Sequence, residues 1–353
     1  MRVSVAAALL RLFIVCLWTA LIFLFLFSTY GTRYLSHEKS INLFLWPMII
    51  DEKVIQQFQK ETGIKVYVSY YESNAELYAK LRATKGGGYD VVVPTDYAMD
   101  LLVNDKMIKK LDKTKLPFFD SIRPFLLGNY FDPKNDYSVP YYLGVYGLGR
   151  NKNAFKDYFP QASWALIFDK DRINYKICMT DGPREAILIA AYYLYGSIDG
   201  IDDPVKLREI TTLLIEQKKW VEVYSSLRVE ELLASGSCPV AVGINADARK
   251  VMRENKNIDF SIPKEGSFVT IDSFVILASS QKEDLAYQFI NFLYRPDIVA
   301  HNSAVYGFCP PLAYMDRKGV ACPSPDVFRN LEFFRNVLSQ EQIHDLWLQV
   351  MSV

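Results

Sequence analysis

Residues 41–97 constrain the fold most strongly, because patterns typical of buried strands and of helices alternate along them without interruption. Residues 41–45 form a short, almost continuous apolar run, as expected for a strand that helices cover on both faces. Residues 51–62 then place apolar side chains on one helical face, and Gly63 follows as a residue that tolerates a left-handed C-terminal cap. A strand followed by a helix is therefore predicted here.

The remainder of this stretch repeats the pattern. Residues 64–68 alternate between apolar and polar side chains, which predicts a second strand, and a second helix follows it. Residues 90–93 are apolar and β-branched and predict a third strand. Parallel strands joined by helices bind ligands at their carboxyl ends. Trp46 and the turn at 95–97 both follow such strand ends, so they are the first candidate ligand contacts.

The chain beyond residue 97 contains further units of this kind. Residues 175–179 predict a strand leading into a helix whose first turn holds Glu185, and residues 238–244 predict a buried strand followed by a turn at Asp247 and another helix. Residues 136–149 are extended, aromatic and punctuated by glycine, which suits a strand passing between two lobes. A chain of 353 residues is too long for one ordinary core. We therefore predict an α/β chain with two lobes.

Charge and motifs exclude several classes of function. Lys+Arg and Asp+Glu balance at 40 each, so no global field favours nucleic acid. We find no Gly-x-Ser-x-Gly elbow, His-x-x-x-His motif or Walker loop, and the three histidines lie in scattered contexts. The cysteines beyond residue 36 include no Cys-x-x-Cys pair and no neighbouring histidine, as a metal site would require. The sequence therefore favours a protein that is no enzyme and holds neither a metal nor a cofactor.

Residues 1–36 differ from the rest of the chain. Basic residues precede the uncharged apolar run at 12–27, a pattern typical of an export signal. A clean small-x-small cleavage site is missing after it, so an uncleaved inner-membrane anchor is the alternative to a signal peptide. Either way, the bulk of the chain is expected in an oxidising, extracytoplasmic space. There Cys309 and Cys322 either form a disulfide or remain buried free thiols.

A set of short segments carries a more specific signal. The segments are ETGIKV (61–66), YESN (71–74), YDVVVP (89–94), DYSVPY (136–141), TD and RE (180–181 and 184–185), PKEG (263–266), IDS (271–273) and INFLYRPD (290–297). Together they resemble the periplasmic spermidine/putrescine-binding proteins of ABC transporters. The resemblance runs from about residue 41 to the C-terminus.

This resemblance implies a type II periplasmic binding protein fold, in which two hinge-connected α/β lobes are joined by crossing strands. Residues 37–143 and 268–309 would form the N-terminal lobe, and residues 144–267 and 310–353 the C-terminal lobe, after a signal peptide or anchor at 1–36. The family holds a polyamine between the lobes and delivers it by hinge closure. The partners implied are a membrane permease and, through it, an ATPase. The location implied is the periplasm, in soluble or tethered form.

The ligand suggests the residues that bind it. Linear polyamines need carboxylates for their ammonium groups and aromatic walls for their methylene stems and for cation–π contact. Carried over position by position, the resemblance gives the ligand-binding residues Trp46, Thr95, Tyr97, Glu185, Ser226 and Asp272. Asp96 and Asp247 stand where the family tends to have neutral residues, and we include them as acids that could replace lost charge.

The chain also departs from the family pattern at several site positions. The departures are Pro47, Met48 and Ile49 where the family commonly has Thr-Glu-Tyr, Gly182 in place of an acid, Ile244 and Thr270 in place of aromatics, and Phe308 in place of a tyrosine. Under one interpretation Asp96 or Asp247 compensates and the protein still binds a polyamine. Under a second, specificity has drifted to a smaller or less charged solute, because an unpaired buried cation costs several kcal/mol. Under a third, the fold serves a membrane-tethered sensor or interaction protein.

Overall fold

The structure, a computed structural model, describes residues 13–19, 22, 39–155, 159–226, 229–315 and 322–353. Most of the predicted signal peptide or anchor at 1–36 therefore lies outside the described residues, apart from a short helical piece at 13–19. Among the residues described, no helix combines the length and the apolar character needed to cross a membrane.

The described residues from Lys39 onward contain helices and strands in alternation. The strands are β1 (Ser40–Leu45), β2 (Lys65–Tyr70), β3 (Val91–Val92), β4 (Val139–Asn151), β5 (Ile177–Met179), β6 (Val221–Tyr224), β7 (Val240–Ile244), β8 (Ile258–Ser261), β9 (Ser267–Ile276) and β10 (Leu331–Phe333). The α-helices are α2 (Glu52–Thr62), α3 (Asn74–Thr84), α4 (Asp96–Asn104), α5 (Ala165–Phe168), α6 (Pro183–Tyr195), α7 (Pro204–Gln217), α8 (Val229–Ser235), α9 (Asn245–Glu254), α10 (Glu283–Leu293), α11 (Pro296–Tyr306), α12 (Pro325–Arg329) and α13 (Gln340–Ser352).

The predicted β-α-β-α-β unit is confirmed as β1, α2, β2, α3 and β3. Helix α2 begins where the Asp51 side chain accepts a hydrogen bond from the Lys53 amide, and it ends at Gly63, whose φ of 69° is left-handed. The three strands pair in parallel in the order β2-β1-β3. Their carboxyl ends therefore meet at one edge of the sheet, where Trp46 and the turn at 95–97 lie.

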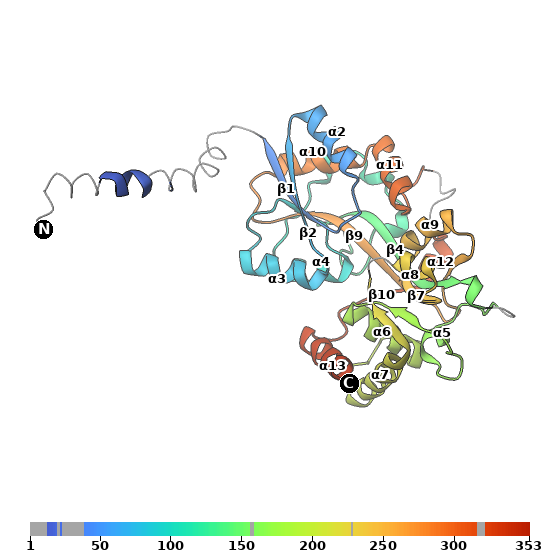
Figure 1. Ribbon diagram of the computed structural model, residues 1–353. Helices are drawn as coiled ribbons and strands as arrows, with labels where there is room; N and C mark the ends of the chain where they lie inside the picture. The colour runs from blue at the N-terminus through green and yellow to red at the C-terminus, as the bar shows by residue number, and fades with distance from the viewer. Residues whose placement is uncertain (1–12, 20–21, 23–38, 156–158, 227–228, 316–321) are drawn as a thin grey trace, which may run out of the picture.

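Two long strands connect this unit to the rest of the sheet. The order β2-β1-β3-β9-β4-β7-β5-β6 places β9 and β4 at the centre, with β10 paired to β9 and β8 to β4. Strand β4 pairs with β9 over residues 139–145 and with β7 over residues 146–150. In Figure 1, β4 and β9 run between the helices around β1 and the helices α6, α7 and α13.

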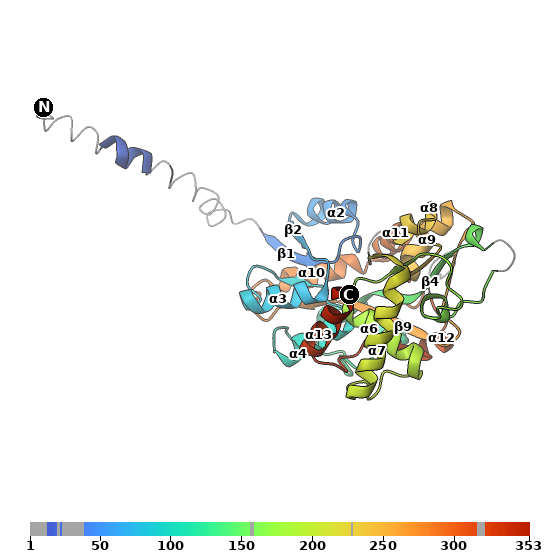
Figure 2. The ribbon, with the colours of Figure 1, turned by 60° about the horizontal axis from the view of Figure 1, so that its bottom comes forward.

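The apolar side chains form two main cores on either side of these central strands. One core is built around Leu43, Phe58 and Phe289, and the other around Trp164, Ile187 and Leu214. Figure 2 shows α6, α7 and α13, which pack on one another and cover the second core. Two cores linked by two continuous strands are the arrangement expected of two lobes with a hinge.

Cys309 and Cys322 form a disulfide, which decides between the two alternatives left open by the sequence. The bond closes a loop with a sequence separation of 13. Replacing both cysteines by alanine is expected to lower the free energy of unfolding by about 2–3 kcal/mol, because the unfolded chain regains the entropy that this loop closure removes. Guanidinium unfolding measures the change. Reductant should destabilise the wild-type protein by a similar amount, and an unchanged midpoint in both experiments would contradict the prediction.

Candidate functional site

Thr95 and Asp272 come together at the carboxyl end of β3. Thr95 directly precedes α4, Asp272 lies within β9, and the two residues form an antiparallel bridge. The Thr95 hydroxyl donates a hydrogen bond of 2.6 Å to Asp272 Oδ1. Burial raises the pKa of the Asp272 carboxyl to about 7, although the Thr95 hydrogen bond acts in the opposite direction. No described residue forms an ion pair with Asp272, so a cationic ligand group could supply the missing charge.

Aromatic side chains gather at the neighbouring strand end. Trp46 packs on Tyr71 with 4.6 Å between ring centroids, and Tyr71 is held by a hydrogen bond from its hydroxyl to the Val93 carbonyl. Burial raises the pKa of Tyr71, and the negative charge of Asp272 adds to the rise. Trp46 Nε1 is buried and has no hydrogen-bond partner among the described residues.

Tyr97 connects this cluster to the second core. It lies in the first turn of α4, and its hydroxyl donates a hydrogen bond of 3.3 Å to Glu185 Oε1 in the first turn of α6. The Arg184 guanidinium lies 4.6 Å from the centre of the Tyr97 ring. Burial raises the pKa of Glu185, while its backbone hydrogen bond, Arg184 and Tyr97 act in the opposite direction. Two partly desolvated carboxyls, Asp272 and Glu185, thus approach the same space from different elements.

Two tyrosines that the sequence analysis did not select lie among these groups. Burial raises the pKa of Tyr146 well above its ordinary value, and the charges of Glu185, Asp272 and Asp247 add to the rise. Burial and the charges of Asp247 and Asp272 do the same for Tyr142. Both tyrosines belong to the segment predicted as an interlobe strand. Its aromatic content was the available signal, but only the pairing of strands shows which rings face the acids.

The structure places the other candidates less centrally. Asp96 is fully buried, and its carboxylate accepts hydrogen bonds from the Ile271 amide (3.0 Å) and the Tyr130 hydroxyl (3.4 Å). Ser226 is exposed and bonds to Thr180 and Asp181 in the loop before Glu185. Asp247 is partly exposed in the first turn of α9. Tyr97, Glu185, Asp247 and Asp272 are therefore electrostatic neighbours of Tyr146, and Thr95 is bonded to Asp272. Trp46 packs on Tyr71 at the neighbouring strand end, whereas Asp96 braces α4 against β9 and Ser226 lies beside the Glu185 loop.

The departures from the family pattern have visible consequences. Ile49 is 3% exposed and belongs to the first core, whereas Met48 is 46% exposed and has a left-handed φ of 59°. A Cβ atom added to Gly182 would lie 2.2 Å from Glu185 Oε2. The missing side chain at residue 182 therefore gives the Glu185 carboxylate room to fold back over the helix start. An acid restored there would compete with Glu185 for the same space.

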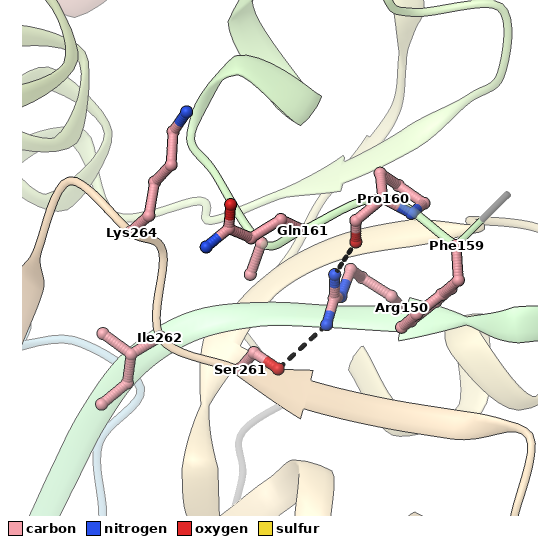
Figure 3. A pocket seen from close by; sticks show the side chains of 8 residues that line it. Arg150, Phe159, Pro160, Gln161, Ser261, Ile262 and Lys264 are labelled. Atoms are coloured by element: carbon pink, nitrogen blue, oxygen red, sulfur yellow. Dashed lines mark hydrogen bonds between the residues drawn. The ribbon is translucent and has the colours of Figure 1, made fainter.

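Two pockets lie away from these residues. One, of about 460 Å³, is lined by Arg150, Phe159 and neighbouring residues (Figure 3). The Arg150 guanidinium there is already held by the Pro160 carbonyl, Ser261 and Asp259, so its charge is compensated within the protein. A second pocket, of about 780 Å³, lies along α9 and β8. No candidate residue lines either pocket, so neither corresponds to the predicted site.

Comparisons with known proteins show the family of the chain. The model of the bacterial extracellular solute-binding protein family matches residues 53–326. The spermidine/putrescine-binding periplasmic protein of Salmonella typhimurium is 34% identical over 279 residues, which cover 78% of each chain. The putrescine-binding periplasmic protein SpuD of Pseudomonas aeruginosa is 32% identical over 340 residues, or 89% of this chain and 92% of SpuD.

Solved structures show the same relationship. The TpPotD lipoprotein of Treponema pallidum superposes with a TM-score of 0.78 at 28% identity, covering 88% of this chain and 99% of that one. The spermidine/putrescine ABC transporter substrate-binding protein PotD of Streptococcus pneumoniae gives a TM-score of 0.74 at 25% identity, covering 89% and 99%. The resemblance inferred from the sequence is thereby confirmed, and the chain belongs to the bacterial extracellular solute-binding protein family with its two-lobed α/β fold.

Proposed function

We propose that the protein binds a polyamine between its lobes as the solute-binding component of an ABC importer. The observation that carries this proposal is the approach of two partly desolvated carboxyls, Asp272 from β9 and Glu185 from α6, among aromatic rings. A carboxylate in such surroundings is stabilised by a cation, and aromatic faces attract cations and pack on methylene stems. The names of the relatives, which include spermidine/putrescine-binding and putrescine-binding proteins, support the same ligand class.

Each part of the site has a role in this proposal. One ammonium group of the ligand binds Asp272, which Thr95 orients, and another binds Glu185, which Tyr97 orients. Trp46 and Tyr97 border the stem between the two ends. Asp247 and Ser226 add polar contacts at the second lobe, and Asp96 holds the start of α4 in place.

The lobes act by hinge closure in this account. Residues 37–143 and 268–309 form the first lobe and residues 144–267 and 310–353 the second in this proposal. The two apolar cores support the division in outline, but Leu312 and Phe328 pack in the first core, so the chain joins the second lobe again only near Phe334. Contacts between Tyr97 and Glu185, and between Asp100 and Asn336, join the lobes in the closed form. A ligand that favours this form shifts the population towards it. The closed protein, in the periplasm, then docks on the permease and its ATPase; the protein itself is a binding protein and no enzyme.

A second candidate ligand is a smaller or less charged solute. It is favoured because Asp96 does not replace the acid that is missing at Gly182. The acid missing at Gly182 is not restored by Asp96, whose two oxygens face the interior. A ligand with a single ammonium group needs only one carboxylate partner, so the acid missing at Gly182 would leave none of the ligand's own charge unpaired. Binding of monoamines in preference to diamines would select this candidate.

Small-angle X-ray scattering tests the proposed mechanism. Saturating putrescine or spermidine is expected to reduce the radius of gyration, because closure brings the lobes together, whereas arginine leaves it unchanged. A radius that no small cation alters would contradict closure. That outcome would favour a sensor or interaction protein with the same fold.

A further inference from the structure

Two tyrosines of β4 lie on the face of the central strands on which the aromatic side chains implied by the resemblance are missing. Ile244 and Thr270 stand at positions where the resemblance described above implies aromatic side chains, so this chain lacks two of the implied walls. In the register of the sheet, Tyr146 lies directly opposite Ile244, and Gly144 directly opposite Thr270. Residues paired in this way present their side chains on the same face.

A β-bulge brings a second tyrosine onto this face. Val139 and Pro140 pair with Phe274 and Ser273, but the register then shifts so that Tyr142 rather than Tyr141 lies opposite Asp272. A bulge inserts one residue and re-aims the side chains that follow. Tyr141 consequently packs in the first core, with 4.9 Å between the centroids of its ring and the Phe274 ring. Tyr142 lies opposite Asp272 in the sheet.

Gly144 allows neighbouring side chains to approach the backbone of β4 closely. A Cβ atom on Gly144 would lie 2.8 Å from Thr270 Oγ1, 3.5 Å from Ile244 Cγ2 and 3.7 Å from a ring carbon of Tyr142. Thr270 and Ile244 thus border the same space as the Tyr142 ring. A large aromatic at residue 270 would compete with Tyr142 for it.

Both rings are held in place and remain partly exposed. Tyr142 packs against Phe308 at 5.1 Å between ring centroids, and Tyr146 against Phe334 at 4.8 Å. Neither hydroxyl bonds to another described residue, and both side chains are only half-buried within strands that are otherwise buried. Aromatic surface kept partly open beside carboxyls is the arrangement that binds organic cations.

We propose that Tyr142 and Tyr146 form the aromatic floor of the polyamine site, replacing from strand β4 the side chains that are absent at Ile244 and Thr270. This inference rests on the proposed polyamine binding. The floor lies between Asp272 and Glu185, so the methylene stem crosses the two rings while its ends reach the carboxylates. The aromatic contacts have moved to the neighbouring strand and have not been lost.

The test is calorimetric titration of the purified full chain and its variants with putrescine and spermidine. Tyr142→Leu and Tyr146→Leu are each expected to weaken binding about tenfold, since each removes one cation–π and stem contact. Tyr142→Phe and Tyr146→Phe should stay within threefold of wild type because the ring is retained. Tyr193→Leu is the matched control: that ring stacks on Phe168 in the second core, and none of the site carboxyls is among its electrostatic neighbours.

A double variant tests the proposal by recovery of binding, in addition to the loss of binding in the single variants. Thr270→Trp alone should weaken binding, because the new ring competes with Tyr142, whereas Thr270→Trp combined with Tyr142→Leu should recover at least half of the loss in log affinity. Thermal unfolding first verifies that both leucine variants are folded. The inference is overturned if both then bind polyamine within twofold of wild type while Glu185→Gln weakens binding. If the wild-type protein binds no polyamine, the proposed function itself is wrong. That result differs from the one that overturns the role of the tyrosines, in which the wild-type protein still binds.

Discussion

Asp272→Asn is expected to weaken polyamine binding by about a hundredfold or more. The substitution keeps the shape and the contact with Thr95 but removes the charge that pairs with a buried ammonium group. Removing one partner of a buried charge pair costs about 2–5 kcal/mol, because the remaining charge stays desolvated without compensation. Calorimetric titration with putrescine and spermidine measures the loss.

Asp96→Asn is the matched control for this prediction. Asp96 is the neighbouring acid, and burial raises the pKa of its carboxyl well above the ordinary value, with Asp272 adding to the rise. Its oxygens already accept bonds from Ile271 and Tyr130, and an amide at this position preserves most of that arrangement. Affinity should therefore stay within about threefold of wild type. Equal losses in the two variants would show that Asp96 supplies the compensating charge, contrary to the proposed roles.

Polyamine affinity is expected to fall about 30-fold between pH 8 and pH 5.5. Only the ionised Asp272 pairs with an ammonium group, and with a pKa of about 7 this carboxyl is largely protonated at the lower pH. The raised pKa of Glu185 acts in the same direction. Titrations across this range measure the slope. Asp272→Asn should flatten it, and a wild-type affinity independent of pH would contradict the assignment.

The same pKa shift has a consequence for stability. Because the folded pKa of Asp272 lies above the unfolded value near 3.9, the empty protein loses stability from this group as the pH rises from about 4 to 7. A bound cation stabilises the ionised form of Asp272, so the liganded protein does not lose this stability as the pH rises. Ligand should therefore raise the melting temperature more at pH 8 than at pH 5.5.

The secondary structure of the first lobe was predictable because its signals are local. The apolar periodicity of residues 51–62 and the cap residues Asp51 and Gly63 act within one or two turns of chain. Likewise, Glu185 could be placed in the first turn of a helix from its immediate neighbours. These features depend little on distant residues.

The roles of the acids were less predictable because they depend on pairing across long sequence separations. The sequence offered Asp96 as an acid that could compensate for lost charge, but its carboxyl faces the interior, whereas the carboxyl of Asp272 meets Thr95 near the rings. The side of the sheet on which the Tyr142 ring lies depends on a β-bulge, and this bulge exists only in the pairing of β4 with β9. The Cys309 and Cys322 pairing also required the fold, since sequence spacing alone does not fix the separation of their Cα atoms, which is 4.7 Å.

Calorimetric titration of the wild-type protein with putrescine, cadaverine, spermidine and spermine, with arginine as a cation that is no polyamine, tests the central claim most directly. Saturable one-to-one binding of at least one polyamine and none of arginine is the predicted result. If none of the four polyamines binds, the family relationship describes ancestry alone, and the ligand belongs to a smaller or less charged class.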